Sequence, residues 1–114
     1  MSTIEISGSE EQLEVQVSGN LASAADVVPL AGILSAADAD LVVVDLTHTM
    51  YVAPDAALAL RAAFRDVASR LSLSVVVPNI DVRVELVRAD VDHVVGLLLD
   101  RSQVPGAGSL PLAG

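Results

Sequence analysis

The sequence predicts an α/β domain in which helices pack against a small, mainly parallel or mixed β-sheet. Residues 41–46 and 73–77 are nearly continuous apolar runs, a pattern typical of strands that are covered on both faces. Segments with helical spacing of apolar residues lie between such runs, and parallel strands need a crossover of this kind. The expected order of elements is β-β-α-β-α-β-α-β.

Length and composition indicate one domain with an aliphatic core. The chain has 114 residues, of which 53% are hydrophobic and only 2% aromatic. That apolar content is ample to close a single core at this length. Residues 1–104 are expected to form the domain. Residues 105–114, PGAGSLPLAG, are rich in small and turn-forming types and are expected to be a flexible tail.

Charge and cysteine content narrow the classes of partner. The net charge is −9, from 15 acidic residues and six arginines with no lysine. Because binding to nucleic acid or to an anionic membrane surface depends on clustered cations, both are disfavoured. No run reaches the ~20 apolar residues of a membrane span, so no membrane insertion is expected. The N-terminus lacks an apolar signal region and cysteine is absent, so a cytoplasmic protein is expected.

The first part of the chain predicts two strands and a helix. Residues 3–6 alternate weakly, and Leu13 to Val17 alternates clearly as a strand with one solvated face, which the Gly19-Asn20 pair ends. Residues 21–38 are expected to be helical, with Ser23 as the cap and Asp26 three residues later. Pro29 and Gly32 weaken this helix.

A second helix is expected after the strand LVVVDLT and the loop HTMYVAP. Pro54 suits the first helical position, because its missing N–H has no partner there in any case. Projection of residues 55–71 at about 100° per residue separates two faces. The face expected to pack on the sheet holds Ala57, Leu60, Ala63, Phe64, Val67 and Leu71. The outward stripe holds Asp55, Leu58, Ala62, Arg65, Asp66 and Ser69.

The last third of the chain predicts a helix and a strand. Residues 80–86 alternate as a strand would, but Ile80, Val84 and Val87 also have helical spacing. A helix is expected here because the buried strands on either side need a crossover. Residues 93–99 are expected to form the last strand.

No catalytic, metal or cofactor site is expected. His48 is expected in a loop and His93 at a strand edge, without the three or four ligands that a metal needs. Asp45 ends a buried strand and is expected to accept hydrogen bonds from the segment that follows. No nucleophile with a base and no glycine-rich phosphate loop stands near it in the chain. Thr47 and Thr49 are the hydroxyls that precede the second long helix.

The order of elements and three segments resemble the STAS domain (sulfate transporter and anti-sigma factor antagonist), the family of bacterial anti-sigma factor antagonists. The segments are VSGNL, VVVDLTHTMYV followed by a helix, and VVVPN followed by VRVELVRADV. The resemblance covers roughly residues 3–99. Asp45, Leu46 and Thr47 match the family's Asp-Leu-Ser, and Tyr51-Val52 match its hydrophobic pair.

The next four positions depart from the family pattern, in which Asp-Ser-Ser/Ala-Gly opens the helix. Ala53 stands in place of Asp, followed by Pro54, by Asp55 in place of the phosphorylatable Ser, and by Ala56 in place of Gly. In family members that switch, phosphorylation of that Ser releases the partner. A phosphate adds about −1.5 to −2 charges, whereas Asp55 carries one permanent charge. Three interpretations of Asp55 follow: a fixed partial mimic of the modified state, a group that serves a partner fitted to a carboxylate, or an ordinary acid of a first helical turn.

The resemblance implies a non-enzymatic regulatory domain that takes part in signalling and transcription control. The implied partner is an anti-sigma factor or a serine-kinase type regulator, and a homodimer is a further state compatible with the sequence. The expected partner-binding residues are Thr47, Thr49, Ala53, Pro54, Asp55, Ala56, Leu58, Ala62 and Arg65. The alternative is the small STAS subunit that supports an ATPase of a lipid-transport ABC complex. An α/β hydrolase or nucleotide-binding enzyme would need a triad or phosphate loop that the sequence lacks.

Overall fold

The structure, a computed structural model, describes residues 2–8 and 11–103. The expected tail at 105–114 lies outside the described residues. Within the described residues the strands are β1 (Ser2–Gly8), β2 (Gln12–Leu21), β3 (Leu41–Val52), β4 (Ser72–Val76) and β5 (Leu97–Leu98). The helices are α1 (Val28–Ser35), α2 (Pro54–Ala68) and α3 (Ile80–Arg88), joined by the short 3-10 turns η1 (Ala24–Val27), η2 (Val91–His93) and η3 (Arg101–Gln103).

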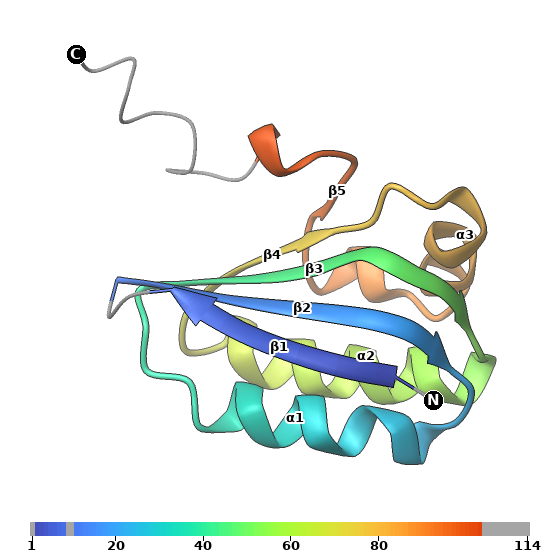
Figure 1. Cartoon of the computed structure of the whole chain (residues 1–114), viewed down its shortest axis with the longest axis horizontal. Coiled ribbons are helices and arrows are strands. Elements are labelled where there is room, and N and C mark those ends of the chain that lie inside the picture. The colour runs from blue at the N-terminus through green and yellow to red at the C-terminus, as the bar shows by residue number, and fades with distance from the viewer. Residues whose placement is uncertain (1, 9–10, 104–114) are drawn as a thin grey trace.

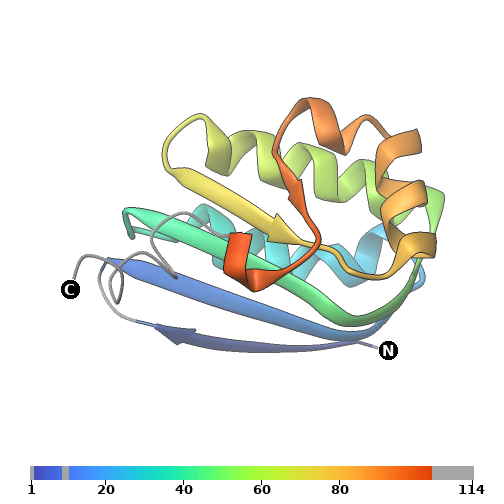
Figure 2. The same cartoon turned by 90° about the horizontal axis from the view of Figure 1, so that it is seen from above.

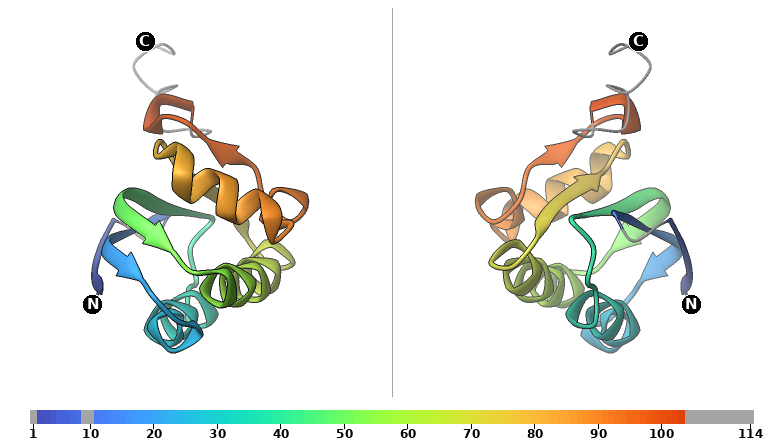
Figure 3. Two further views of the ribbon diagram at one scale, coloured as in Figure 1. Left: turned by 90° about the vertical axis from the view of Figure 1, so that its right-hand side faces the viewer. Right: turned by 90° about the vertical axis from the view of Figure 1, so that its left-hand side faces the viewer.

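The strands form a mixed sheet in the order β1-β2-β3-β4-β5 (Figure 1). β1 is antiparallel to β2, and each later neighbour pair is parallel. Figures 2 and 3 show α1 and α2 side by side along the sheet, with α3 beside α2 toward the β4 and β5 edge. The predicted α/β class, the mainly parallel sheet and the order of elements are confirmed.

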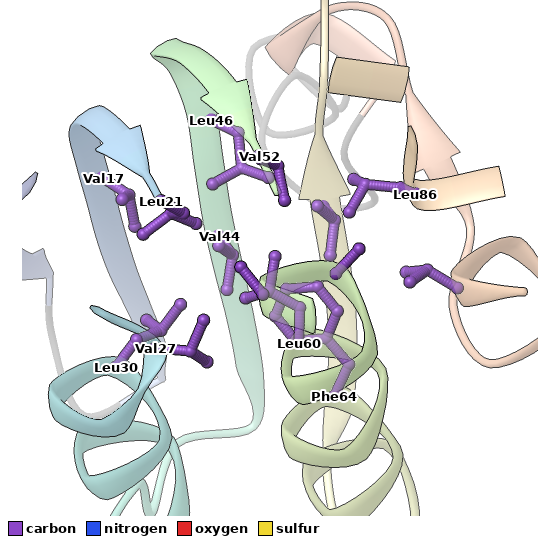
Figure 4. Packing of buried hydrophobic residues seen from close by; sticks show 14 of the residues in the cluster. Val17, Leu21, Val27, Leu30, Val44, Leu46, Val52, Leu60, Phe64 and Leu86 are labelled. Carbon is purple, nitrogen blue, oxygen red and sulfur yellow. The ribbon is translucent and has the colours of Figure 1, made fainter. Parts of the chain in front are cut away.

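The main core lies between the helices and one face of the sheet (Figure 4). Val17 and Leu21 of β2, Leu60 and Phe64 of α2, and Leu86 of α3 are fully buried in it. Side chains alternate between the faces of a strand, so Val43 lies on the opposite face of β3, where it forms a smaller cluster with Val76. No helix in the described part of the chain is both long and apolar enough to cross a membrane.

The central strand is longer than expected. The segment predicted as a loop, HTMYVAP, is largely part of β3, which continues to Val52 and pairs there with Leu21. The Gly19-Asn20 pair does not end β2 either. Gly19 has φ 95° and lies next to a shift in register, so the strand accommodates an irregularity and continues. Glycine adopts a positive φ at little cost, and the long strands β2 and β3 thereby stay paired.

The first helix is shorter than expected and begins later. Leu21 belongs to β2, and α1 starts only at Val28, after the 3-10 turn η1. Ser23 makes no capping hydrogen bond; instead the Asp26 carboxylate accepts the Ala22 N–H at 2.8 Å. Pro29 falls in the first turn of α1, where its missing N–H costs least.

The C-terminal strand predicted over residues 93–99 is reduced to Leu97–Leu98. His93 lies in the 3-10 turn η2 rather than at a strand edge. The predicted helix over 80–86 is confirmed as α3, and the Asn79 side chain caps it by accepting the N–H groups of Asp81 and Val82. α2 starts with Pro54 in its first turn, as predicted, and ends at Ala68 rather than at 71.

Candidate functional site

The start of α2 is fixed by the carboxyl ends of two neighbouring strands. The Ala53 N–H donates to the Leu21 carbonyl at 2.8 Å, which joins the end of β3 to the end of β2. The Ala53 carbonyl then accepts the Ala57 N–H at 2.9 Å, so Ala53 is the N-cap and Pro54 follows it. Proline at this place removes an N–H that would otherwise lack a partner. The direction in which α2 leaves the sheet is therefore set by the two strand ends.

Asp55 is exposed on the first turn of α2, and its carboxylate has a partner. Oδ2 of Asp55 accepts the Ala24 N–H at 3.0 Å. Ala24 begins η1, so this bond ties the first turn of α2 to the turn that precedes α1. A negative charge here also offsets the partial positive charge of the helix start. The carboxylate thus has a structural role while part of it faces solvent.

The predicted outward stripe of α2 is exposed, and its middle is hollowed. A hollow of about 440 Å³ is lined by Leu58, Arg61, Ala62, Arg65, Asp66 and Ser69. A smaller hollow of about 150 Å³ lies against α3 and is lined by Pro54, Leu58, Glu85, Arg88 and Ala89. Leu58 is 56% exposed and lines both hollows. We call the stripe from Pro54 to Ser69 with these two hollows the α2 surface.

Cations surround the apolar centre of the α2 surface. Arg61 and Arg65 are one helical turn apart and line the larger hollow together. The negative charge of Asp66, in the same lining, is offset by Arg70 at 3.3 Å. Sequence reasoning missed Arg61, although its spacing from Leu58 and Arg65 places it beside the outward stripe.

Three of the nine expected binding residues lie inside the molecule. Thr49 and Ala56 have no exposed surface and Ala53 has almost none. The Thr49 hydroxyl donates to the Val17 carbonyl at 2.8 Å, close to a shift in the β2–β3 register. A buried carbonyl needs such a partner, so this hydroxyl is structural and inaccessible to a kinase. These side chains support the α2 surface from beneath and do not contact a partner on it.

Thr47 lies away from the α2 surface. Its N–H donates to Asp45 Oδ1 at 2.9 Å, and its hydroxyl donates to the same oxygen. The prediction that Asp45 accepts hydrogen bonds from the following residues is confirmed. Asp45, Thr47 and His48 line a hollow of about 450 Å³ that shares no lining residue with the two hollows of α2. The structure therefore brings together Pro54, Asp55, Leu58, Ala62 and Arg65 on α2, without Thr47.

Two exposed residues next to the helix start were not expected. Met50 and Tyr51 lie at the end of β3 with their side chains exposed, whereas Val52 is buried. The alternation of a strand explains the change of side between Tyr51 and Val52. Sequence reasoning missed the pair because it treated this segment as a loop, in which no face could be assigned.

The histidines form no common site. His48 lines the hollow near Asp45, and His93 in η2 lies 3.9 Å from Asp90 and 4.0 Å from Asp92. Among the described residues, Asp90, Asp92 and His93 are the group whose ligand atoms lie close enough together for a metal ion. All three are exposed, and exposed charge pairs of this kind are common and weak.

The mixed sheet with helices on one face puts the chain in the class of small α/β domains, and its fold is that of STAS domains. It is similar to a crystal structure of an anti-sigma factor antagonist from Mycobacterium paratuberculosis, with a TM-score of 0.75 and 17% identity over 90% of this chain and 89% of that one.

Two further solved structures have the same fold. The anti-sigma factor antagonist SpoIIAA in its unphosphorylated form has a TM-score of 0.60 and 7% identity over 83% of this chain and 87% of that one. The STAS domain of an antisigma-factor antagonist from Rhodobacter sphaeroides has a TM-score of 0.55 and 16% identity over 65% of this chain and 84% of that one. No family model and no curated protein matches the sequence.

Proposed function

We propose that this chain is a non-enzymatic protein-interaction domain of the STAS type, which regulates a cytoplasmic partner as anti-sigma factor antagonists do. The partner that fits this proposal is an anti-sigma factor or its serine-kinase domain. The observation that carries it is Leu58, an exposed leucine between two hollows on α2. An exposed apolar side chain in a hollowed surface that also holds arginines suits a protein contact, because arginine is enriched at protein interfaces.

The proposal includes a constant charge at the helix start. Asp55 has a carboxylate and no hydroxyl that could accept a phosphate. A partner that binds this surface meets a carboxylate. The interface therefore suits a partner that accommodates a negative charge, or a partner that can leave the surface without phosphorylation of this chain. The bond from Ala24 holds the carboxylate in one place and supports a constant role.

Titration of purified anti-sigma factors and their kinase domains tests the proposal. Wild type should bind one of them, and Leu58→Arg should weaken that binding at least tenfold because it places a charge in the apolar centre of the surface. Ile6→Arg is the matched control, since Ile6 on β1 is exposed to a similar degree and lies outside the α2 surface. Equal affinity of wild type and Leu58→Arg would remove α2 as the contact.

A second candidate function is support of an ATPase in a lipid-transport ABC complex through the same surface. The observation that favours it is the engaged carboxylate of Asp55, because a permanent subunit contact needs no phosphorylatable hydroxyl. Affinity purification of the chain from native membranes and cytosol separates the two candidates. Recovery of a stoichiometric ATPase supports the transport complex, and recovery of an anti-sigma factor supports the regulator.

A further inference from the structure

A second exposed apolar surface lies on α3, outside the α2 surface. Ile80, Val84 and Val87 are 66%, 42% and 44% exposed. Their spacing places them along one side of the helix, while Val82 and Leu86 on the other side are buried in the core. We call these three residues the α3 stripe. The three branched aliphatic side chains therefore form one continuous apolar line on α3 and are not scattered singly over the surface.

The α3 stripe is framed by two cations. A shallow hollow of about 310 Å³ is lined by the three stripe residues together with Arg83 and Arg88. Its lining holds no carboxylate, and Glu85 lines the hollow on the side of α2 instead. All six arginines follow residue 60, and the net charge of the chain is −9. Arg83 and Arg88 therefore give the α3 stripe a local positive charge on a molecule that is acidic as a whole.

Arg83 is held in place beside the stripe. Its Nη2 donates to the Leu97 carbonyl at 3.0 Å, which anchors the guanidinium to the segment that enters β5. Nη1 is buried and has no acceptor within the part of the chain that the structure describes. Within the same part, no carboxylate forms an ion pair with Arg83 or Arg88. The charge of Arg83 is therefore fixed in position beside the stripe and not offset by an ion pair with any described residue, and a side chain that is already held in place loses little conformational entropy when an anion lies near it.

We infer that the α3 stripe is a second docking surface, and that its occupant is an acidic amphipathic helix of a protein partner. The apolar ridge of that helix would cover Ile80, Val84 and Val87, and carboxylates on its two flanks would face Arg83 and Arg88. Grooves that accept such helices read apolar residues at one-turn spacing, and flanking charge of the complementary sign gives specificity. The inference rests on the α3 stripe with Arg83 and Arg88, and it does not require that a partner bind α2, although Arg88 also lines the smaller hollow of the α2 surface.

Synthetic amphipathic helices of about 18 residues test the inference with the full-length protein. One peptide carries a leucine ridge with glutamate on both flanks, and its matched control carries lysine in place of glutamate. We expect the acidic peptide to bind at least about tenfold more tightly than the basic one, with weaker binding at higher salt. Amide chemical shifts should change along residues 80–88 and at Leu97.

Variants assign the binding to α3. Val84→Asp should weaken binding of the acidic peptide about tenfold, and Arg88→Gln should make this binding less dependent on salt concentration. Ile6→Asp on β1, an exposed apolar residue outside both surfaces, should leave peptide binding unchanged, and circular dichroism checks that each variant is folded. Absence of saturable binding, equal binding of both peptides, or shifts confined to α2 would overturn the inference. Sedimentation of the protein alone is the last measurement. A dimer that Val84→Asp dissolves would make a second copy the occupant and would also overturn it.

Discussion

Asp55 and Ala24 are 31 residues apart in the sequence and joined by a hydrogen bond of 3.0 Å from the Ala24 N–H to Asp55 Oδ2. The bond connects the first turn of α2 with the turn that leads into α1. N–H groups at a helix start lack partners within the helix, and a carboxylate from another helix supplies one here. Asp55 is therefore part of the framework that joins the first turn of α2 to the turn before α1.

Replacement of Asp55 separates its charge from its hydrogen bond. Asp55→Ala should lower the free energy of unfolding by about 1–2 kcal/mol, because it removes both the bond and the favourable charge at the helix start. Asp55→Asn keeps an acceptor and should lose less, about 0.3–1 kcal/mol. Urea unfolding measures both values, and faster hydrogen exchange at the Ala24 amide in Asp55→Ala locates the effect. Identical stability of both variants and wild type would mean that the bond contributes nothing in solution.

Asp55→Ser tests whether the carboxylate stands in for a phosphorylated serine. If a cognate kinase exists, this variant should gain one phosphate at position 55, since the side chain at this position is exposed, and wild type should gain none there. The phosphorylated variant should bind partners as wild type does, because both carry negative charge at the helix start. Intact-mass measurement after incubation with candidate kinases gives the result. A variant that no kinase labels would leave the acid with its structural role alone.

Thr49 and Thr47 should respond differently to loss of their hydroxyls. Thr49→Val leaves the buried Val17 carbonyl without its partner and should cost about 1–3 kcal/mol. Thr47→Val changes an exposed residue and should lower the free energy of unfolding by less than Thr49→Val does. Thermal unfolding of the two variants, with Thr49→Ser as the control that keeps the hydroxyl, measures the difference. A larger loss for Thr47→Val would contradict the assignment of Thr49 to the core.

Leu58 and Leu60 form a matched pair on one helix with opposite environments. Leu60 is fully buried, and Leu60→Ala should cost about 2–5 kcal/mol through lost burial and a cavity. Leu58→Ala removes an exposed side chain and should change stability by less than about 0.5 kcal/mol. Leu58→Ala should instead weaken partner binding more than Leu60→Ala does. A strong destabilisation by Leu58→Ala would mean that this leucine serves the fold rather than an interface.

The periodicity of apolar residues determined much of this protein in advance. The buried runs of β3 and β4, the two faces of α2 and the start of α2 at Pro54 agree with the sequence predictions, because burial of an apolar face is a local requirement that repeats along an element. Residues 80–86 alternate as a strand would, and only the crossover that parallel strands require favours a helix there.

Tertiary structure alone decided where the strands end and which site residues reach the surface. β3 continues to Val52 because β2 lies beside it as far as Leu21, and pairing between distant segments leaves no local signal in either one. Thr49 is of a residue type that is common in loops, yet its hydroxyl donates a hydrogen bond to the Val17 carbonyl of β2. Asp55 looks like any acid of a first helical turn until Ala24 is brought to it. Local patterns fix the elements of this chain, whereas contacts between distant segments fix the role of each polar group.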